Sequence, residues 1–139
     1  MSPRYQIEFT PCNGVEVRID PHEARRPFVL TRPLSMTLRG RGGTKPSLHI
    51  TVPAGFGLDM ASIPRLLWPV IPRDDRRIAR AATVHDYLYD QQTLPRPVAD
   101  SLFLAIMRSD GMPWFKRTAC YLAVRLFGGR AWSQEERPA

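Results

Sequence analysis

The chain has 139 residues, of which 43% are hydrophobic, and a formal net charge of +7. A chain of this size can bury a core without metal or disulfide staples, so we expect a single domain over residues 1–139. The two cysteines, Cys12 and Cys120, form neither a multi-cysteine framework nor a CxxC pair. This spacing excludes a disulfide scaffold and a zinc ribbon.

The N-terminal sequence lacks the apolar core of a signal peptide, and no apolar run approaches the ~20 residues that span a bilayer. We therefore expect a protein that is made in the cytoplasm and has no transmembrane segment. Lys45 and Lys116 are the only lysines among the 20 basic residues. Arginine suits phosphate and carboxylate partners, although a GC-rich genome would produce the same composition. The basic residues are scattered, and no Lys/Arg-rich run with interleaved aromatics stands out, which argues against dedicated nucleic-acid binding.

Residues 1–52 show mainly strand patterns. Alternation of apolar and polar residues in the first two candidates places one face of each strand on a core. Glycines and a proline between the last two candidates are typical of a hairpin loop. These features predict a small antiparallel sheet. The candidate strands are 5–9, 15–19, 28–30, 36–38 and 48–52.

Residues 73–129 show helical patterns, with apolar positions three and four apart. Pro97 suits the first turn of the second helix, and the glycine pair Gly128-Gly129 predicts the end of the third. The fold class is therefore α+β, with an antiparallel helical hairpin. The predicted segments are a connector at 53–72 with a helical turn near 63–68, helices at 74–89, 97–111 and 113–127, and a polar tail at 130–139.

Helical register brings His85 and Asp100 to similar heights on the two hairpin helices. About seven residues, 90–96, join these helices. His85 lies about five residues before the first helix ends, and Asp100 about three after the second begins, so they fall within one turn of each other. A histidine held by a carboxylate at one ring nitrogen is the basic unit of general-base catalysis.

Further polar residues surround this pair on the connector and the hairpin. Asp59 and Asp86 supply carboxylate oxygens suited to a hard cation such as Ca²⁺, and Ser62 lies nearby on the connector. The alternative is structural: a single histidine on an apolar helix face is commonly a satisfied core residue, and Asp100 complements the helix dipole. Arg125 is either an ion-pair partner or a surface residue. Burying so many polar groups for packing alone would be costly, which favours a site.

Several motifs occur in order at compatible spacing and resemble a family of tailed phages and prophages, domain of unknown function 1353. The resemblance covers roughly residues 45–129. It implies a phage context and carries no established activity. The motifs are Pro53-Ala54-Gly55-Phe56, Asp59-Met60-Ala61-Ser62-Ile63-Pro64, the segment AATVHDYLY at 81–89, Ala99-Asp100, and AVRLFG at 123–128.

The segment AATVHDYLY is also similar in register to the CCxxHDxCY signature of secreted phospholipases A2. Ala81, Ala82 and Leu88 stand where that family has cysteines, and its glycine-rich calcium loop is replaced. The resemblance implies that His85 is the general base and Asp100 its orienting partner. It further implies that Asp86 is a calcium ligand and that Tyr89 supports the dyad.

The leading hypothesis is a phage-encoded hydrolase acting on an ester or amide of the cell envelope, with anionic lipid or an envelope polymer as its partner. One alternative is a non-enzymatic virion or tail-assembly component, whose partners would be phage structural proteins and whose location would be the particle. Another is a peptidoglycan peptidase with a metal held by the same residues. Zinc would need more His or Cys ligands than this segment supplies, so calcium ranks above it.

Overall fold

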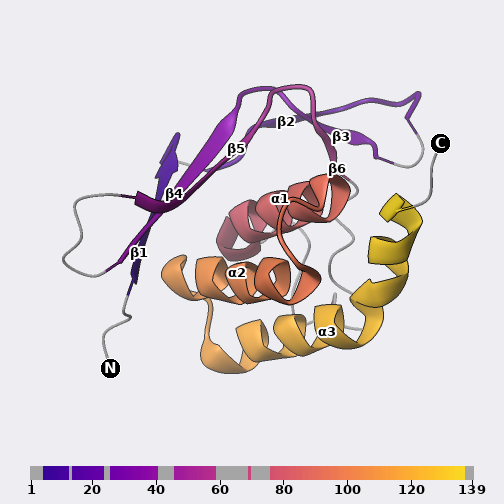
Figure 1. The fold of residues 1–139 in the computed structure, drawn as a ribbon. Helices are drawn as coiled ribbons and strands as arrows, with labels where there is room; N and C mark the ends of the chain where they lie inside the picture. The colour runs from indigo at the N-terminus through magenta and orange to yellow at the C-terminus, as the bar shows by residue number, and fades with distance from the viewer. Residues whose placement is uncertain are drawn as a thin grey trace. The chain divides into compact units, whose positions relative to one another are not determined.

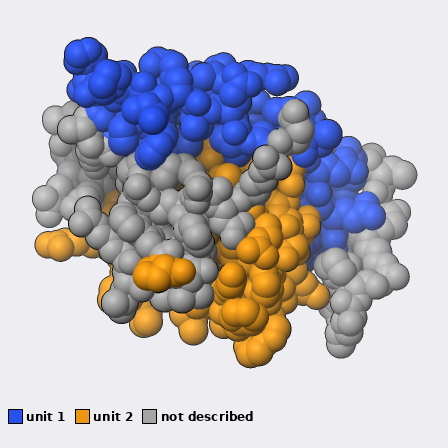
Figure 2. All heavy atoms as spheres, turned by 180° about the vertical axis from the view of Figure 1, so that it is seen from behind, with its two compact units in different colours: residues 1–58 blue, residues 59–139 orange. Residues whose placement is uncertain are grey.

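The computed structural model of this chain is α+β, as predicted, with strands β1–β6 preceding helices α1–α3 (Figure 1). The chain divides into two compact units, residues 1–58 and residues 59–139, which Figure 2 colours separately. The expectation of a single domain stays a prediction. The structure describes residues 5–12, 14–23, 26–40, 46–58, 69 and 76–136.

The larger sheet of the first unit contains β1 (Tyr5–Thr10), β4 (Leu34–Gly40) and β5 (Pro46–Val52). Its strands are antiparallel in the order β1-β4-β5, which confirms the predicted hairpin between the last two. Alternate residues of β4 and β5 point into the core, and Met36 and Val52 are fully buried.

The other face of this sheet carries polar cross-strand pairs between β4 and β5. Ser35 and Thr51 share a hydrogen bond of 3.0 Å between their hydroxyls. Thr37 lies opposite His49, with 2.9 Å between its hydroxyl and the Nδ1 of the imidazole. Pairs of this kind stabilise a register and need no ligand to explain them.

The second sheet has the order β2-β3-β6, with β2 (Val17–Ile19), β3 (Phe28–Leu30) and β6 (Gly57–Leu58). Two predictions fail here. All three residues of the edge strand β2 are exposed, so no face of it is buried in a core. The connector predicted from residue 53 contains a strand, because the chain turns back to pair with β3.

The turn before β6 explains the first of the sequence motifs. Gly55 has φ +90°, a conformation that suits glycine, and its N–H donates to the carbonyl of Leu30 at 2.7 Å. The N–H of Phe56 closes the turn onto the carbonyl of Pro53 at 3.3 Å. The helical turn predicted near residues 63–68 lies outside the described residues.

The second unit contains α1 (Arg76–Gln91), α2 (Arg96–Ser109) and α3 (Trp114–Glu136). Helix α2 packs against both α1 and α3. The predicted apolar stripe of α1 is buried as expected. In the described part of the chain, no helix is long and apolar enough to cross a membrane.

The connection between α1 and α2 is shorter than predicted. Gln92 has φ +54° and its N–H donates to the carbonyl of Leu88 at 2.8 Å, which ends α1 two residues later than expected. Only residues 92–95 remain as a loop before α2. At the other end of the hairpin, Arg80 forms a partly buried ion pair with Asp110 and thereby links α1 to the end of α2.

Candidate functional site

His85 and Tyr89 lie one turn apart on α1, a spacing that puts both side chains on one face of the helix. His85 is 4% exposed. The centroid of its ring lies 4.2 Å from that of Tyr89 and 4.7 Å from that of Phe103 on α2. These ring contacts hold the imidazole in one orientation within the packed hairpin.

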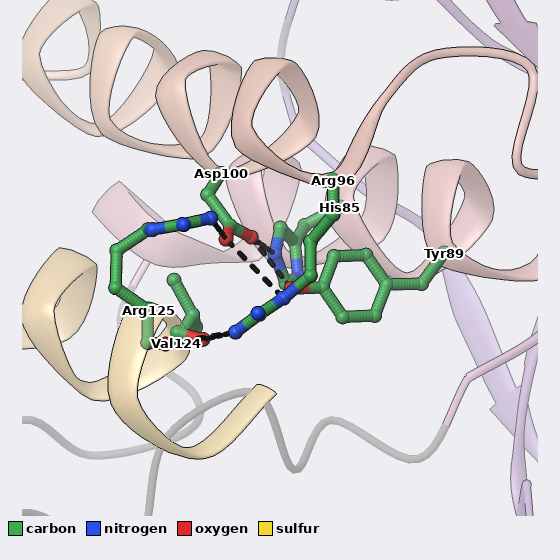
Figure 3. A network of polar contacts seen from close by, with 6 residues as sticks. All are labelled: His85, Tyr89, Arg96, Asp100, Val124 and Arg125. Carbon is green, nitrogen blue, oxygen red and sulfur yellow. Dashed lines mark hydrogen bonds and ion pairs between the residues drawn. The ribbon is translucent and has the colours of Figure 1, made fainter. Parts of the chain in front are cut away.

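Asp100 on α2 has no exposed surface and meets both of these residues (Figure 3). Its Oδ1 lies 2.7 Å from Nε2 of His85. The same oxygen accepts a hydrogen bond of 2.7 Å from the hydroxyl of Tyr89. The contact between His85 and Asp100 that the helical register predicted is therefore confirmed.

Two arginines complete what we call the Asp100 cluster, namely His85, Tyr89, Arg96, Asp100 and Arg125. Arg125 on α3 donates to Oδ2 of Asp100 at 2.7 Å. Of the two roles that the sequence allowed for Arg125, ion-pair partner or surface residue, the first is therefore correct. Arg96 was not predicted. Its Nε donates to the hydroxyl of Tyr89 at 3.2 Å and lies 3.8 Å from Oδ2 of Asp100. The i, i+4 spacing of Arg96 and Asp100 is the sequence feature that could have indicated this ion pair.

The cluster keeps Asp100 charged and Tyr89 neutral. Burial by itself raises the pKa of Asp100, but hydrogen bonds from His85, Tyr89 and Arg125 outweigh it, and the pKa is lowered. Burial, followed by the hydrogen bond to Asp100, raises the pKa of the Tyr89 phenol. Near neutral pH, a carboxylate therefore accepts hydrogen bonds from a protonated phenol.

Arg96 also binds the backbone of α3. Its NH2 group donates to the carbonyls of Val124 at 2.9 Å and Arg125 at 2.8 Å. In an unbroken helix these carbonyls accept from Gly128 and Gly129, four residues later. The prediction that the glycine pair ends the helix is wrong, as is the predicted tail, because α3 continues to residue 136. Figure 1 shows α3 changing direction in its C-terminal part, as expected where a side chain meets the helical ladder beside glycines.

Gly128→Ala is expected to destabilise the protein. A Cβ at this position would lie 2.7 Å from the hydroxyl of Tyr89, which cannot move without disturbing its bonds to Asp100 and Arg96. Overpacking of this kind costs about 1–3 kcal/mol in the free energy of unfolding, measured by urea denaturation. Gly129→Ala is the matched control, since its nearest contact is 3.4 Å, at the Arg96 guanidinium. Equal changes in both variants would contradict this role for Gly128.

Of the remaining predicted site residues, only Asp86 lies in the described part of the chain. Asp86 is half-buried and follows His85 on α1, where successive side chains diverge by about 100° around the helix. Asp59 and Ser62 lie outside the described residues. Among the residues that the structure does describe, no group of three His, Cys, Asp or Glu side chains could hold a metal ion. The predicted calcium site at Asp59 and Asp86 stays a prediction.

The geometry has a defined chemical capacity. A carboxylate on Nε2 fixes which nitrogen of His85 is engaged and stabilises the imidazolium that forms when Nδ1 takes a proton. Tyr89 and Arg125 hold the carboxylate in place and ionised. The arrangement suits a general base whose orienting partner is itself fixed by other helices.

Comparison with known families gives a match to the model described as Protein of unknown function (DUF1353), over residues 39–124. The match covers more than half of the chain. The chain belongs to this family. The DUF1353 match includes His85, Tyr89, Arg96 and Asp100, while Arg125 follows its last residue directly.

The chain is also similar to a curated relative, "Uncharacterized protein y4jT" of Sinorhizobium fredii (strain NBRC 101917 / NGR234). It is 32% identical over 78 residues, which are 55% of this chain and 23% of the relative. The aligned part thus spans about a quarter of the relative's length. No solved structure matches the chain.

Proposed function

We propose that this protein is a phage-encoded hydrolase that cleaves an ester or amide of the bacterial cell envelope, with His85 as general base. The supporting observation is the buried contact of 2.7 Å between His85 Nε2 and Asp100 Oδ1. A histidine buried only for packing does not need an ionised carboxylate that also accepts hydrogen bonds from Tyr89 and Arg125. The phage context comes from the resemblance of the sequence motifs.

The proposed reaction uses residues of the chain at each step. His85 accepts a proton at Nδ1 from a water molecule, whose oxygen attacks the carbonyl carbon of the substrate. Asp100 stabilises the imidazolium, and the proton then passes to the leaving alcohol or amine as its bond to the carbonyl carbon breaks. Tyr89 and Arg125 are positioning residues that act through Asp100.

The local resemblance to secreted phospholipases A2 favours an ester over an amide as the bond that is cleaved. The resemblance implies a general base at His85, its carboxylate partner at Asp100 and a supporting tyrosine at Tyr89. Asp100 contacts both of the other side chains here. A divalent cation near Asp86 and Asp59 belongs to the proposal as well. Because the described residues supply only Asp86 toward it, the proposed reaction has no step through a cation.

The substrate is tested by incubating purified protein with vesicles of mixed phospholipids and, separately, with peptidoglycan. We expect release of fatty acid from the vesicles, which would identify an ester, and no soluble product from peptidoglycan. Release of peptides from peptidoglycan instead would identify an amide and favour the peptidase alternative. If neither the phospholipid vesicles nor the peptidoglycan released a product, the proposed hydrolase would be contradicted.

A second candidate is a non-enzymatic component of the virion or tail. The observation that favours it is that Asp100 joins all three helices, since its partners come from α1, α2 and α3. Such a cluster would stabilise the helical unit without chemistry. A stoichiometric band in purified virions, together with inactivity on both substrates, would support this candidate.

A further inference from the structure

Helix α3 is apolar on more than one side. One side packs within the second unit through Cys120, Ala123 and Val124, which are all buried. A helix that is apolar all round is normally covered on every side. The outer side is nevertheless exposed, and this requires an explanation.

The exposed apolar residues of α3 form a stripe. Phe115, Leu122 and Leu126 are spaced seven and four residues apart, so they lie on one face of the helix. Trp114 and Phe127 flank this row at its two ends, each about 100° around the helix from its neighbour in the row. The rings of Trp114 and Phe115 pack edge to face, with their centroids 6.0 Å apart. These five residues, the α3 stripe, are 51–73% exposed. Exposed apolar residues in such a row mark an interaction surface.

Charge around the α3 stripe identifies the kind of partner. Beside the stripe, residues 114–130 contain Lys116, Arg117 and Arg130 in addition to Arg125, which pairs with Asp100, and no Asp or Glu; the acidic residues of α3, Glu135 and Glu136, come after the stripe. A second copy of a chain with net charge +7 would bring the same positive segment against itself and be repelled. An anionic surface is attracted instead. Aromatic and leucine residues beside basic ones are typical of helices that lie in a membrane interface.

We propose that the α3 stripe docks onto an anionic phospholipid bilayer. Trp114, Phe115, Leu122, Leu126 and Phe127 enter the interface, while neighbouring basic side chains meet the lipid phosphates. Leu126 follows Arg125, which binds Asp100. A bilayer on the α3 stripe therefore lies next to the Asp100 cluster. Docking does not depend on the proposed hydrolysis. Together with the proposed hydrolysis, it would bring the Asp100 cluster close to a lipid substrate.

The test is co-sedimentation of the full chain with vesicles of phosphatidylcholine, with and without phosphatidylglycerol. We expect binding only to the anionic vesicles, weakening as salt rises. The double variant Leu122→Ser/Leu126→Ser should bind at least about tenfold more weakly, because it removes two apolar side chains from the interface. Ile19→Ser, on the exposed strand β2, is the matched control and should bind like wild type.

Three results would overturn the docking proposal. Equal binding to neutral and anionic vesicles would remove the role of charge. Unchanged binding by the double variant would remove the α3 stripe. A dimer of wild type that the double variant converts to a monomer, without vesicle binding by either, would assign the stripe to self-association. His85→Gln should bind vesicles like wild type, which separates failure of docking from failure of catalysis.

Discussion

Asp100→Asn lowers the free energy of unfolding by about 3 kcal/mol, the low end of the range for breaking a buried ion pair. The amide keeps the shape of the side chain but removes the negative charge that two arginines share. Arg96 and Arg125 are partly exposed and can recover some hydration, which is why the low end applies. The change is measured by urea or guanidinium denaturation of both proteins at neutral pH.

Asp90→Asn is the matched control for this substitution. It makes the same chemical change on α1, where the carboxylate of Asp90 is partly exposed and accepts a hydrogen bond of 2.7 Å from the side chain of neighbouring Gln91. We expect its effect to stay within about 0.5 kcal/mol. If Asp100→Asn were as mild as Asp90→Asn, the Asp100 cluster would not stabilise the helical unit.

The contribution of Asp100 also depends on pH in a defined direction. Its pKa in the folded protein is lowered below the unfolded value, which is about 3.9 for an ordinary Asp. The unfolded chain therefore binds the proton first as the pH falls, and the native state loses stability. The difference in unfolding free energy between wild type and Asp100→Asn should be complete above the unfolded pKa. It should shrink as the pH falls through the folded pKa.

His85→Gln abolishes general-base catalysis on whichever substrate the wild type cleaves, and we expect the rate to fall about 10²–10⁴-fold. Glutamine has similar length and can still donate a hydrogen bond toward Asp100, but it cannot take a proton from water. The rate is measured on the phospholipid or peptidoglycan substrate identified for the wild type. Folding is checked by circular dichroism on the same sample.

His49→Gln is the control for the loss of an imidazole. His49 lies on β5, in the first unit, and its ring nitrogens are within hydrogen-bond distance of the hydroxyls of Thr37 and Thr51. Its rate should equal that of wild type. Full activity in a folded His85→Gln variant would exclude His85 as the general base, and the structural candidate would then be favoured.

Part of the site was predictable because helical periodicity is a local property. The apolar stripe of α1 and the position of Pro97 predicted the two helices of the hairpin. Counting residues from the ends that the loop joins then placed His85 and Asp100 at similar heights. The predicted loop was longer than the observed 92–95, but a shift of about one turn still leaves the two side chains within reach.

Other parts were not predictable from local patterns. Gly128-Gly129 has the composition of a helix end, yet α3 continues to residue 136. The absence of side chains at the two glycines leaves room for Tyr89 and for Arg96, which binds the carbonyls of Val124 and Arg125. The connector likewise contains β6, since its pairing partner β3 lies far away in sequence. Local propensity cannot show a partner that only the fold brings near.

The sequence alone determined a basic chain of α+β class, its helical hairpin and the proximity of His85 to Asp100. These follow from periodicity and register, which operate over a few turns. Only the tertiary structure decided that Arg96 and Arg125 converge on Asp100, and that α3 has an apolar side left exposed. Both depend on how α3 packs against α2, which is a long-range arrangement that no short segment of the chain encodes by itself.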